Sequence, residues 1–536
     1  MPSSKDAKKS RTTNRLSSGI EELDHILGGG FPTKRLFLIE GAPGSGKTTL
    51  ALPFLLAGAK NSEKGLYVTF SESEDEVRAV AESHGWVLDG IHLQELSTLG
   101  DRLKSEEQYT VFQPADVELS ETVQRVIDDV RRLKPERVVI DSLSEIRLVA
   151  RDPLRYRRQI LVLKEILSEC SCTVLFLEDY TVENPDLLLQ SIAHGVVLLE
   201  KTQSEYGSVK RKLQVTKLRA GPSLEGSHDF AIRRGGLQVF RRLVASDSLD
   251  GMRPKDAGGV LKTNNEELDR LTGGGMRWGT GLVLVGPAGT GKSTVGIQIV
   301  SAAAQQGYKT CAFLFDEAKN TYIKRAKNVD LDLASHMQDG MIEIHQVDPN
   351  EQSPGEFAYR VRRRVEDDGV RVVVIDSLNG YLTAMTSERF LLAQLHELLA
   401  YLSAHGVLTI MTTAQHGMLN TTDTTSFELT YLADVVIYLR YFEAGGSVRK
   451  AISVIKSRLS AHETSIREFE ITAKGLEIGT PLRQFEGILT GIPKFLGGAD
   501  DLLQFGSSGS TGSGSKEPSS KGPGSKGSDS KGATAG

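Results

Sequence analysis

The chain has 536 residues, of which 39% are hydrophobic, 25% are charged and 6% are aromatic, and its formal net charge is −5. Because one hydrophobic core rarely serves more than about 250–300 residues, this length predicts at least two domains. The composition excludes a collagen-like chain, a wholly disordered chain and a small disulfide-rich protein. The acidic balance also argues against a protein that coats duplex DNA.

No run of residues approaches the roughly 18 consecutive apolar positions of a membrane span. The N-terminal segment MPSSKDAKKSRTTNR is basic but lacks the apolar run of a secretion signal. The three cysteines, Cys170, Cys172 and Cys311, are too few for a disulfide framework and are typical of a reducing compartment. We therefore expect a cytoplasmic protein without a membrane segment.

The chain contains one set of motifs twice. The sequence GIEELDHILGGG at 19–30 is matched by NNEELDRLTGGG at 264–275. A glycine-rich loop, an apolar run ending in IDS and a K-x-R sequence also recur in the same order. Repeats of this length are far too long for a solenoid, so they predict a duplicated domain.

The repeat divides the chain into four predicted segments. They are a flexible N-terminus (1–14), a first ATPase domain (15–248), a second domain (249–485) and a C-terminal regulatory segment with a disordered tail (486–536). The seam at 244–259 is rich in Gly, Asp and Ser, as linkers are. Residues 506–536 hold nine Gly, ten Ser and no aromatic residue, which predicts the disordered tail.

Short apolar runs alternate with helical patterns in each copy. These runs lie at 35–40, 65–70, 137–141 and 173–178 in the first copy, and at 281–286, 310–316, 370–376 and 406–413 in the second. They are apolar throughout rather than alternating, as strands buried on both faces are. The sequence therefore predicts an α/β fold with two mostly parallel sheets, each flanked by helices.

Each copy has a glycine-rich loop between an apolar strand and a helix. GAPGSGKT (41–48) and GPAGTGKS (286–293) both match the P-loop of nucleotide-binding proteins. Glycines allow backbone N–H groups to turn toward phosphates at the start of the helix. The predicted ATP-binding residues are Gly41, Gly44, Ser45, Gly46, Lys47, Thr48 and Thr49 in the first copy, and Gly286, Gly289, Thr290, Gly291, Lys292, Ser293 and Thr294 in the second.

An acid ends the third apolar run of each copy, at Asp141 and Asp376. This is the Walker B position, where a carboxylate holds Mg²⁺ together with the P-loop hydroxyl. The predicted magnesium residues are therefore Thr48 with Asp141, and Ser293 with Asp376.

Hydrolysis also needs a carboxylate that polarises the attacking water. The candidates follow the second apolar run of each copy. Glu72 stands there in the first copy, after Ser71, and the adjacent pair Asp316 and Glu317 stands there in the second. We predict that these three acids are catalytic.

Two copies with EELD…GGG, a P-loop, an acid after the second strand, IDS and K-x-R resemble the KaiC family over roughly residues 15–490. The most specific series is LRYFE (439–443), KSR (456–458) and IREFEIT (466–472). The resemblance implies tandem RecA-like P-loop domains that use ATP and Mg²⁺ and form a hexameric ring with nucleotide between subunits. It also implies Ser/Thr autokinase activity in the second domain and KaiB-like partner proteins.

The resemblance further implies that a Lys-x-Arg from one subunit reaches the γ-phosphate held by its neighbour. The matching residues are Lys217 and Arg219 in the first copy, and Lys456 and Arg458 in the second. This is an arginine-finger arrangement, which stabilises the charge that spreads over the γ-phosphate oxygens.

The family's second domain phosphorylates a Ser-Thr pair just before the strand that leads to LRYFE. The matching positions are Thr430 and Tyr431, so this chain departs from the pattern. Thr425 and Ser426, in a segment dense in hydroxyls, are alternative acceptors. We expect phosphate on the Thr or Ser hydroxyls, because the phenol oxygen of tyrosine lies farther from the backbone.

Two other function classes share these motifs. A DNA-dependent ATPase of RecA or DnaB type needs basic pore loops with aromatic residues. Residues 142–159 contain five Arg and one Tyr, whereas 377–390 are not basic. An ATP-gated scaffold with little catalysis also fits, because a fold does not determine a function. We expect a signalling or timing ATPase rather than a nucleic-acid-binding protein.

Overall fold

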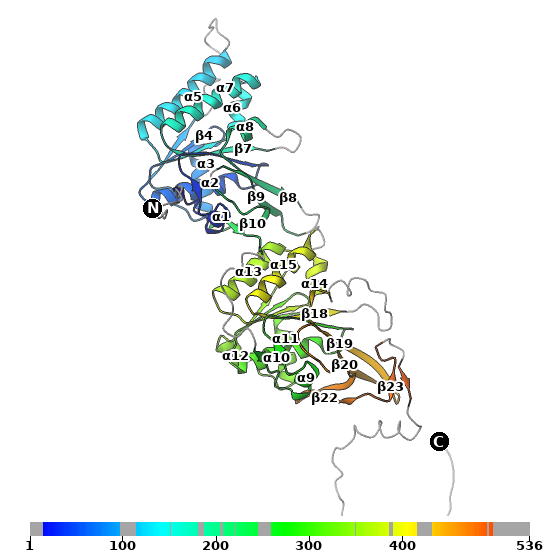
Figure 1. The fold of residues 1–536 in the computed structure, drawn as a ribbon. Coiled ribbons are helices and arrows are strands. Elements are labelled where there is room, and N and C mark those ends of the chain that lie inside the picture. The colour runs from blue at the N-terminus through cyan, green and yellow to red at the C-terminus, as the bar shows by residue number, and fades with distance from the viewer. Residues whose placement is uncertain are drawn as a thin grey trace, which may run out of the picture.

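The computed structural model describes residues 14–96, 114–150, 152–180, 187–203, 207–219, 221–244, 259–348, 350–384, 390–414, 431–489 and 493–496. Two lobes are stacked end to end (Figure 1), and each contains a nine-stranded sheet with helices on both faces. The predicted fold class, two tandem α/β domains with mostly parallel sheets, is confirmed.

The sheet of the first lobe has the strand order β11-β10-β9-β8-β3-β7-β6-β4-β5. Its strands are β3 (Leu36–Gly41), β4 (Gly65–Thr69), β5 (Ile91–Glu95), β6 (Arg137–Asp141), β7 (Thr173–Asp179), β8 (Gly195–Thr202), β9 (Lys210–Leu218), β10 (Ser227–Arg233) and β11 (Gly236–Phe240). The six strands from β8 to β5 are parallel, and β9, β10 and β11 continue the sheet as antiparallel strands. A separate pair, β1 (Arg15–Leu16) and β2 (Phe31–Pro32), lies at the start of the lobe.

Helices cover both faces of this sheet because alternate residues of each strand point to opposite sides. Leu36 and Leu38 of β3 pack with the group α5 to α7, whereas Phe37 and Ile39 pack with the group α1 to α3. The helices are α1 (Glu21–Ile26), α2 (Lys47–Lys60), α3 (Glu74–Ser83), α5 (Pro114–Leu133), α6 (Leu143–Ala150), α7 (Pro153–Glu169) and α8 (Leu187–Ile192).

The second lobe repeats this plan, with the strand order β16-β15-β17-β18-β14-β19-β20-β21-β22. Its strands are β14 (Gly281–Gly286), β15 (Thr310–Leu314), β16 (Ile342–Gln346), β17 (Val372–Asp376), β18 (Leu408–Ala414), β19 (Val435–Ala444), β20 (Ser447–Ser457), β21 (Arg467–Thr472) and β22 (Gly475–Pro481). Two short pairs lie outside this sheet: β12 (Val260–Leu261) pairs with β13 (Met276–Arg277), and β23 (Phe485–Glu486) pairs with β24 (Lys494–Phe495). Its helices are α9 (Glu266–Leu271), α10 (Lys292–Gln305), α11 (Lys319–Asn328), α12 (Leu333–Gln338), α13 (Pro354–Glu366), α14 (Leu378–Ala384) and α15 (Leu391–Ala404). Among the described residues, no helix combines the length and apolar character needed to cross a membrane.

The repeated EELD motif has a structural role in each lobe. Asp24 accepts hydrogen bonds from the Ser17 hydroxyl at 2.6 Å and the Ser18 amide at 2.7 Å. Asp269 accepts in the same way from the amide and hydroxyl of Thr263, at 3.0 and 2.8 Å. The motif therefore fastens the first short helix of each lobe to the segment that precedes it.

The lobes are held together by charged contacts between the β10–β11 hairpin and helices of the second lobe. Arg233 donates to both carboxylate oxygens of Glu356 on α13, at 2.6 and 2.8 Å. The amide of Gly355 donates to Asp229 at 2.9 Å. Nη2 of Arg233 thus bridges the two oxygens of Glu356 at the start of α13, and the buried pair of Arg362 on α13 with Glu22 on α1 adds a second charged contact between the lobes.

His228 makes the first lobe sensitive to acid. This buried ring lies on β10 with Nε2 3.2 Å from the Leu224 carbonyl oxygen, and Nδ1 accepts from the Arg242 amide at 3.0 Å. Burial lowers its pKa from 6.5 to about 4, and the positive charges of Arg242 and Arg241 add to this effect. Protonation would place a proton on Nδ1, facing the Arg242 N–H.

The unfolded chain binds this proton below its pKa near 6.5, and the folded chain binds it only near pH 4. Stability present above pH 6.5 is therefore lost as the pH falls toward 4, by about 2 kcal/mol between pH 7 and pH 5. Urea unfolding of the wild type and His228→Gln at both pH values checks this. The variant should lose correspondingly less stability, and equal losses in the two proteins would contradict the assignment.

Candidate active sites

The two P-loops have matching backbone conformations. Gly46 and Gly291, which precede α2 and α10, have φ angles of +109° and +107°. A Cβ atom on Gly46 would lie 2.8 Å from Cδ1 of Ile232, and one on Gly291 would lie 2.5 Å from Cδ1 of Ile471. In the described part of the chain, no side chain caps either helix N-terminus. The first N–H groups of both helices are therefore available to a phosphate.

The predicted ATP-binding residues occupy the loops 41–46 and 286–291 and the first helical turns after them. In the first lobe, Nζ of Lys47 donates to the Gly41 carbonyl at 2.8 Å and to Asp179 at 2.7 Å. In the second, Nζ of Lys292 donates to the carbonyls of Gly286 and Pro287, at 2.7 and 2.9 Å. Burial lowers the pKa of Lys292. Both ammonium groups are thus directed into their own loops.

The predicted magnesium residues of the first lobe lie together. The Thr48 hydroxyl is 3.2 Å from Oδ2 of Asp141, and the hydroxyl of Tyr67 donates to the same oxygen at 2.5 Å. Burial raises the pKa of Asp141, although both hydrogen bonds act in the opposite direction. A hydroxyl beside a carboxylate supplies the oxygen ligands that Mg²⁺ prefers.

In the second lobe, Asp376 is 8% exposed. Its Oδ1 accepts from the Thr412 hydroxyl at 2.5 Å, and its Oδ2 is buried without a hydrogen-bond partner among the described residues. Leaving a buried carboxylate oxygen unpaired is costly. A cation held directly or through water would satisfy this oxygen, and Ser293 in the first turn of α10 carries the hydroxyl that matches Thr48, so these residue types fit Mg²⁺.

The three predicted catalytic acids have different surroundings. Glu72 has a buried Oε2 without a partner in the described chain. Burial raises the pKa of Glu72, and the negative charges of Asp141 and Glu76 raise it further. A carboxylate with a raised pKa is suited to accepting a proton near neutral pH.

The adjacent acids of the second lobe point to different partners. Asp316 accepts a hydrogen bond from the hydroxyl of Ser377, the residue after Asp376. Glu317 accepts from Nη2 of Arg325 at 2.7 Å. Burial raises the pKa of Glu317, while Arg325 acts to lower it. The geometry separates a pair that the sequence could not distinguish.

A cavity of about 430 Å³ adjoins the second P-loop. This volume is within the usual range for small-molecule sites. Its lining is Gly289, Gly291, Lys292, Ser293, Thr294, Arg325, Asn328, Val329, Ile471, Thr472 and Ala473. The P-loop therefore forms one side of the cavity, and α11 with the tip of the β21–β22 hairpin forms the other.

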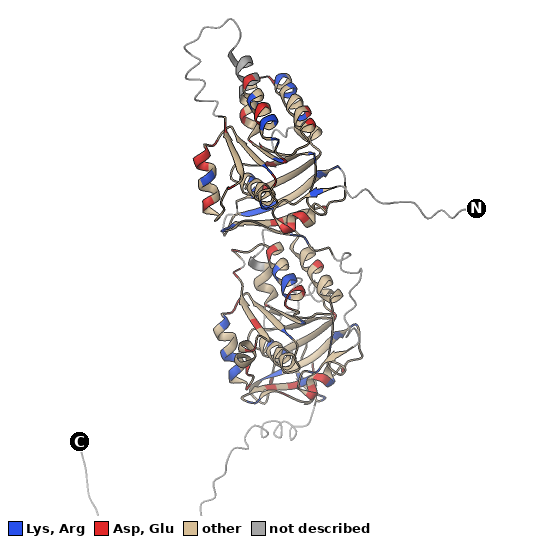
Figure 2. Cartoon of the chain, turned by 90° about the vertical axis from the view of Figure 1, so that its left-hand side faces the viewer, with Lys and Arg blue, Asp and Glu red and all other residues tan. Residues whose placement is uncertain are grey.

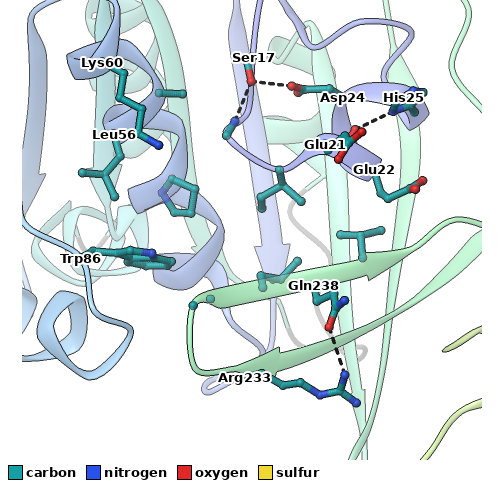
Figure 3. Close-up of a pocket in the computed structure, with 18 of the residues that line it drawn as sticks. Ser17, Glu21, Glu22, Asp24, His25, Leu56, Lys60, Trp86, Arg233 and Gln238 are labelled. Atoms are coloured by element: carbon teal, nitrogen blue, oxygen red, sulfur yellow. Dashed lines mark hydrogen bonds between the residues drawn. The ribbon is translucent and has the colours of Figure 1, made fainter. Parts of the chain in front are cut away.

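A larger cavity of about 1380 Å³ lies beside the β10–β11 hairpin of the first lobe. Figure 3 shows Lys60 and Trp86 on one side of it and Glu21 on the other, with Arg233 of the hairpin below. Tyr359 of α13 also lines it, so it extends to the second lobe. Among the described residues, none of 41–49 lines this space, which is therefore distinct from the first P-loop.

The Lys-x-Arg residues and the P-loop of the first lobe lie at opposite ends of the sheet, measured along the strands. Lys217 pairs with Val196, and the Arg219 amide donates to the carbonyl of His194, whose own amide donates to Leu36. Gly41 lies five positions after Leu36 on β3, which corresponds to about 16 Å along a strand. The phosphate loop and the cations are thus at opposite ends of the same strands.

The second lobe has the same arrangement. Nζ of Lys456 donates to the Ala433 carbonyl at 2.8 Å, and Nη2 of Arg458 donates to the Tyr431 carbonyl at 2.9 Å. Burial and the neighbouring arginine lower the pKa of Lys456, and the same causes lower that of Lys217. Neither cation pair can reach the phosphates bound in its own lobe.

The geometry agrees with a comparison to known families. A family model described as "ATPase: KaiC" matches residues 16–244 and 261–483. The chain belongs to the KaiC ATPase family. Use of ATP follows from this membership, and the two matched ranges correspond to the two lobes.

Individual KaiC proteins align along most of the chain. The circadian clock protein KaiC3 of Synechocystis sp. is 25% identical over 492 residues, covering 90% of this chain and 95% of the relative. The circadian clock oscillator protein KaiC of Thermostichus vulcanus is 26% identical over 498 residues, covering 92% and 94%. That of Prochlorococcus marinus is 25% identical, covering 91% and 97%.

The predicted phosphoacceptors of this KaiC-family chain are only partly described. Thr425, Ser426 and Thr430 lie outside the described residues. Tyr431 is 60% exposed and stands four residues before β19. Its carbonyl accepts from Arg458, so Tyr431 adjoins the Lys-x-Arg of the same lobe.

Three residues at the sites were not predicted from the sequence. Asp179 pairs with Lys47 across 132 positions, and Tyr67 binds Asp141 across 74. Arg325 binds Glu317 from two turns along the following helix. An acid directly after the apolar run 173–178 was a usable signal for Asp179, whereas Tyr67 and Arg325 depend on side-chain packing.

Proposed function

We propose that this chain is a ring-forming ATPase, with a hexamer as the expected assembly, in which each Lys-x-Arg completes the active site of a neighbouring copy. The observation that carries the proposal is the separation of each Lys-x-Arg from its own P-loop by the length of a strand. The Lys-x-Arg cations, at the strand ends away from the P-loop, can act on phosphates only where they meet the P-loop of another subunit. Repetition of such a head-to-tail contact closes a ring.

The residues of each site have different proposed roles in hydrolysis. The P-loop amides and Lys47 or Lys292 would hold the β- and γ-phosphates, and Thr48 with Asp141, or Ser293 with Asp376, would hold Mg²⁺, which would neutralise phosphate charge when bound. Glu72 or Glu317 orients the water and accepts its proton as the water oxygen bonds to γ-phosphorus and the bond to the ADP oxygen breaks.

The second lobe would also transfer phosphate to a hydroxyl of its neighbour. Support comes from the bond between Arg458 and the Tyr431 carbonyl, because an arginine that reaches a neighbouring site would bring Tyr431 close to that site. In-line transfer needs the acceptor oxygen about 3–3.5 Å from phosphorus. Such an autokinase could serve as a timing device, as the names of the clock relatives suggest, or as a signalling device, and KaiB-like proteins are the partners that we propose.

Phosphopeptide mapping after incubation of the full chain with Mg-ATP tests the autokinase. We expect phosphate within residues 421–431, mainly on Thr430 or on Thr425 and Ser426. Where the phosphate maps to Thr430, Thr430→Ala removes the acceptor hydroxyl and should lower incorporation by about tenfold or more. Tyr431→Phe should change it little, because a phenol oxygen displaced by about 1 Å from the in-line position loses about a hundredfold in rate. Phosphate mainly on Tyr431, or none in this segment, would support an ATPase without this activity.

A further inference from the structure

Arg325 connects a proposed catalytic acid to the nucleotide cavity of the second lobe. Its Nη2 donates to Oε1 of Glu317 at 2.7 Å, and the two side chains are 37% and 16% exposed. The same side chain lines the 430 Å³ cavity together with Lys292 and Ser293. The guanidinium therefore stands between the Glu317 carboxylate and the space beside the P-loop.

Among its described residues, the first lobe has no counterpart of this contact. Helices α3 and α11 begin 245 positions apart, as do Glu72 and Glu317, so the position that matches Arg325 is Val80. Val80 packs against the hydrophobic core, and Oε2 of Glu72 is buried without a partner among the described residues. The two lobes thus differ in what holds the carboxylate.

The helices that carry these positions also differ in charge. The first turn of α3 contains Glu74, Asp75 and Glu76, whereas α11 has four cations and no acid. Figure 2 shows the contrast, with mainly red residues on α3 and blue residues on α11. Of the α11 cations, Arg325 both contacts Glu317 and lines the cavity.

We propose that Arg325 is a positioning residue that fixes the Glu317 carboxylate beside the nucleotide cavity, a control that is specific to the second lobe. The inference rests on the proposed function of Glu317 as the acid that orients the attacking group. A hydrogen bond from a charged donor is shorter and stronger than one from a neutral group, so it restrains the carboxylate that accepts it. Without it, Glu317 would sample several rotamers, and a misplacement of about 1 Å can cost about a hundredfold in rate.

The test uses the full chain with Glu72→Gln, so that the remaining turnover belongs to the second lobe. Arg325→Gln should lower kcat by about tenfold to a hundredfold, with KM and the dissociation constant of a fluorescent ADP analogue changed less than about threefold. Arg325→Lys, which keeps one donor, should restore kcat to within about threefold of the parent. Lys324→Ala removes an exposed neighbouring charge and should change neither quantity.

Glu317→Gln in the same background distinguishes the proposed role of Glu317 from that of Arg325. If it leaves turnover intact, the proposed role of Glu317 is wrong. If it abolishes turnover while Arg325→Gln does not change kcat, only the inference about Arg325 is wrong. A weaker dissociation constant with unchanged kcat, or a loss of kcat that Arg325→Lys does not restore, would also overturn that inference.

Discussion

Lys47→Ala and Lys292→Ala should each remove nucleotide binding from one lobe and leave the other lobe intact. Each ammonium is directed into a loop of backbone carbonyls at the start of α2 or α10. Hydrogen bonds from a charged donor contribute about 1.5–3 kcal/mol each, so the loss of two to the β- and γ-phosphates lowers affinity at least about a hundredfold. Calorimetric titration should count one site per chain instead of two.

The first lobe should lose more affinity than the second. Removing the Lys47 ammonium leaves the Asp179 carboxylate, now without that cation, facing the phosphates, whereas Ala414 occupies the matching register beside Lys292. Lys47→Ala with Asp179→Ala should therefore bind nucleotide more tightly than Lys47→Ala alone. Lys60→Ala, at the other end of α2, is the control and should keep both sites. Two sites of normal affinity in either P-loop variant would contradict the assignment.

Arg219→Ala together with Arg458→Ala should abolish turnover while leaving nucleotide bound. An arginine finger contributes about 10³–10⁵ to the rate of phosphoryl transfer, so we expect a loss of at least about a thousandfold. The matched control is Arg132→Ala, since Arg132 is an exposed arginine on α5 that pairs with Asp129. Steady-state hydrolysis and equilibrium binding of an ATP analogue measure the two effects. Unchanged hydrolysis would show that neither arginine takes part in phosphoryl transfer.

The central strands could be predicted because their composition is decisive. Every residue of β3, β6 and β17 is buried, and their apolar stretches run without alternation, which is typical of strands covered on both faces. The antiparallel strands β9, β10 and β11 were not predicted. β9 has the sequence KRKLQVTKL and is mostly half-buried. Because four of its nine residues are cations, it lacks the apolar pattern of a strand, and its pairing with β8 stabilises it instead.

The site residues also differ in how well the sequence alone could predict them. The P-loops are local, so spacing alone identified Lys47 and Lys292 as candidates. Thr48 and Asp141 are 93 residues apart and meet because the parallel strands β3 and β6 have their carboxyl ends at the same end of one sheet. The location of Lys217 and Arg219 at the other end required the register of β8 and β9. Contacts such as Glu317 with Arg325 depend on rotamers that no motif records.

The most direct test of the account mixes two inactive proteins. One carries Lys47→Ala and Lys292→Ala and keeps its Lys-x-Arg residues, and the other carries Arg219→Ala and Arg458→Ala and keeps its P-loops. Where an intact P-loop meets an intact Lys-x-Arg across an interface, a complete site forms. Random mixing of equal amounts should therefore restore about a quarter of the wild-type rate. No recovery in assemblies shown by two affinity tags to contain both proteins would contradict active sites shared between subunits.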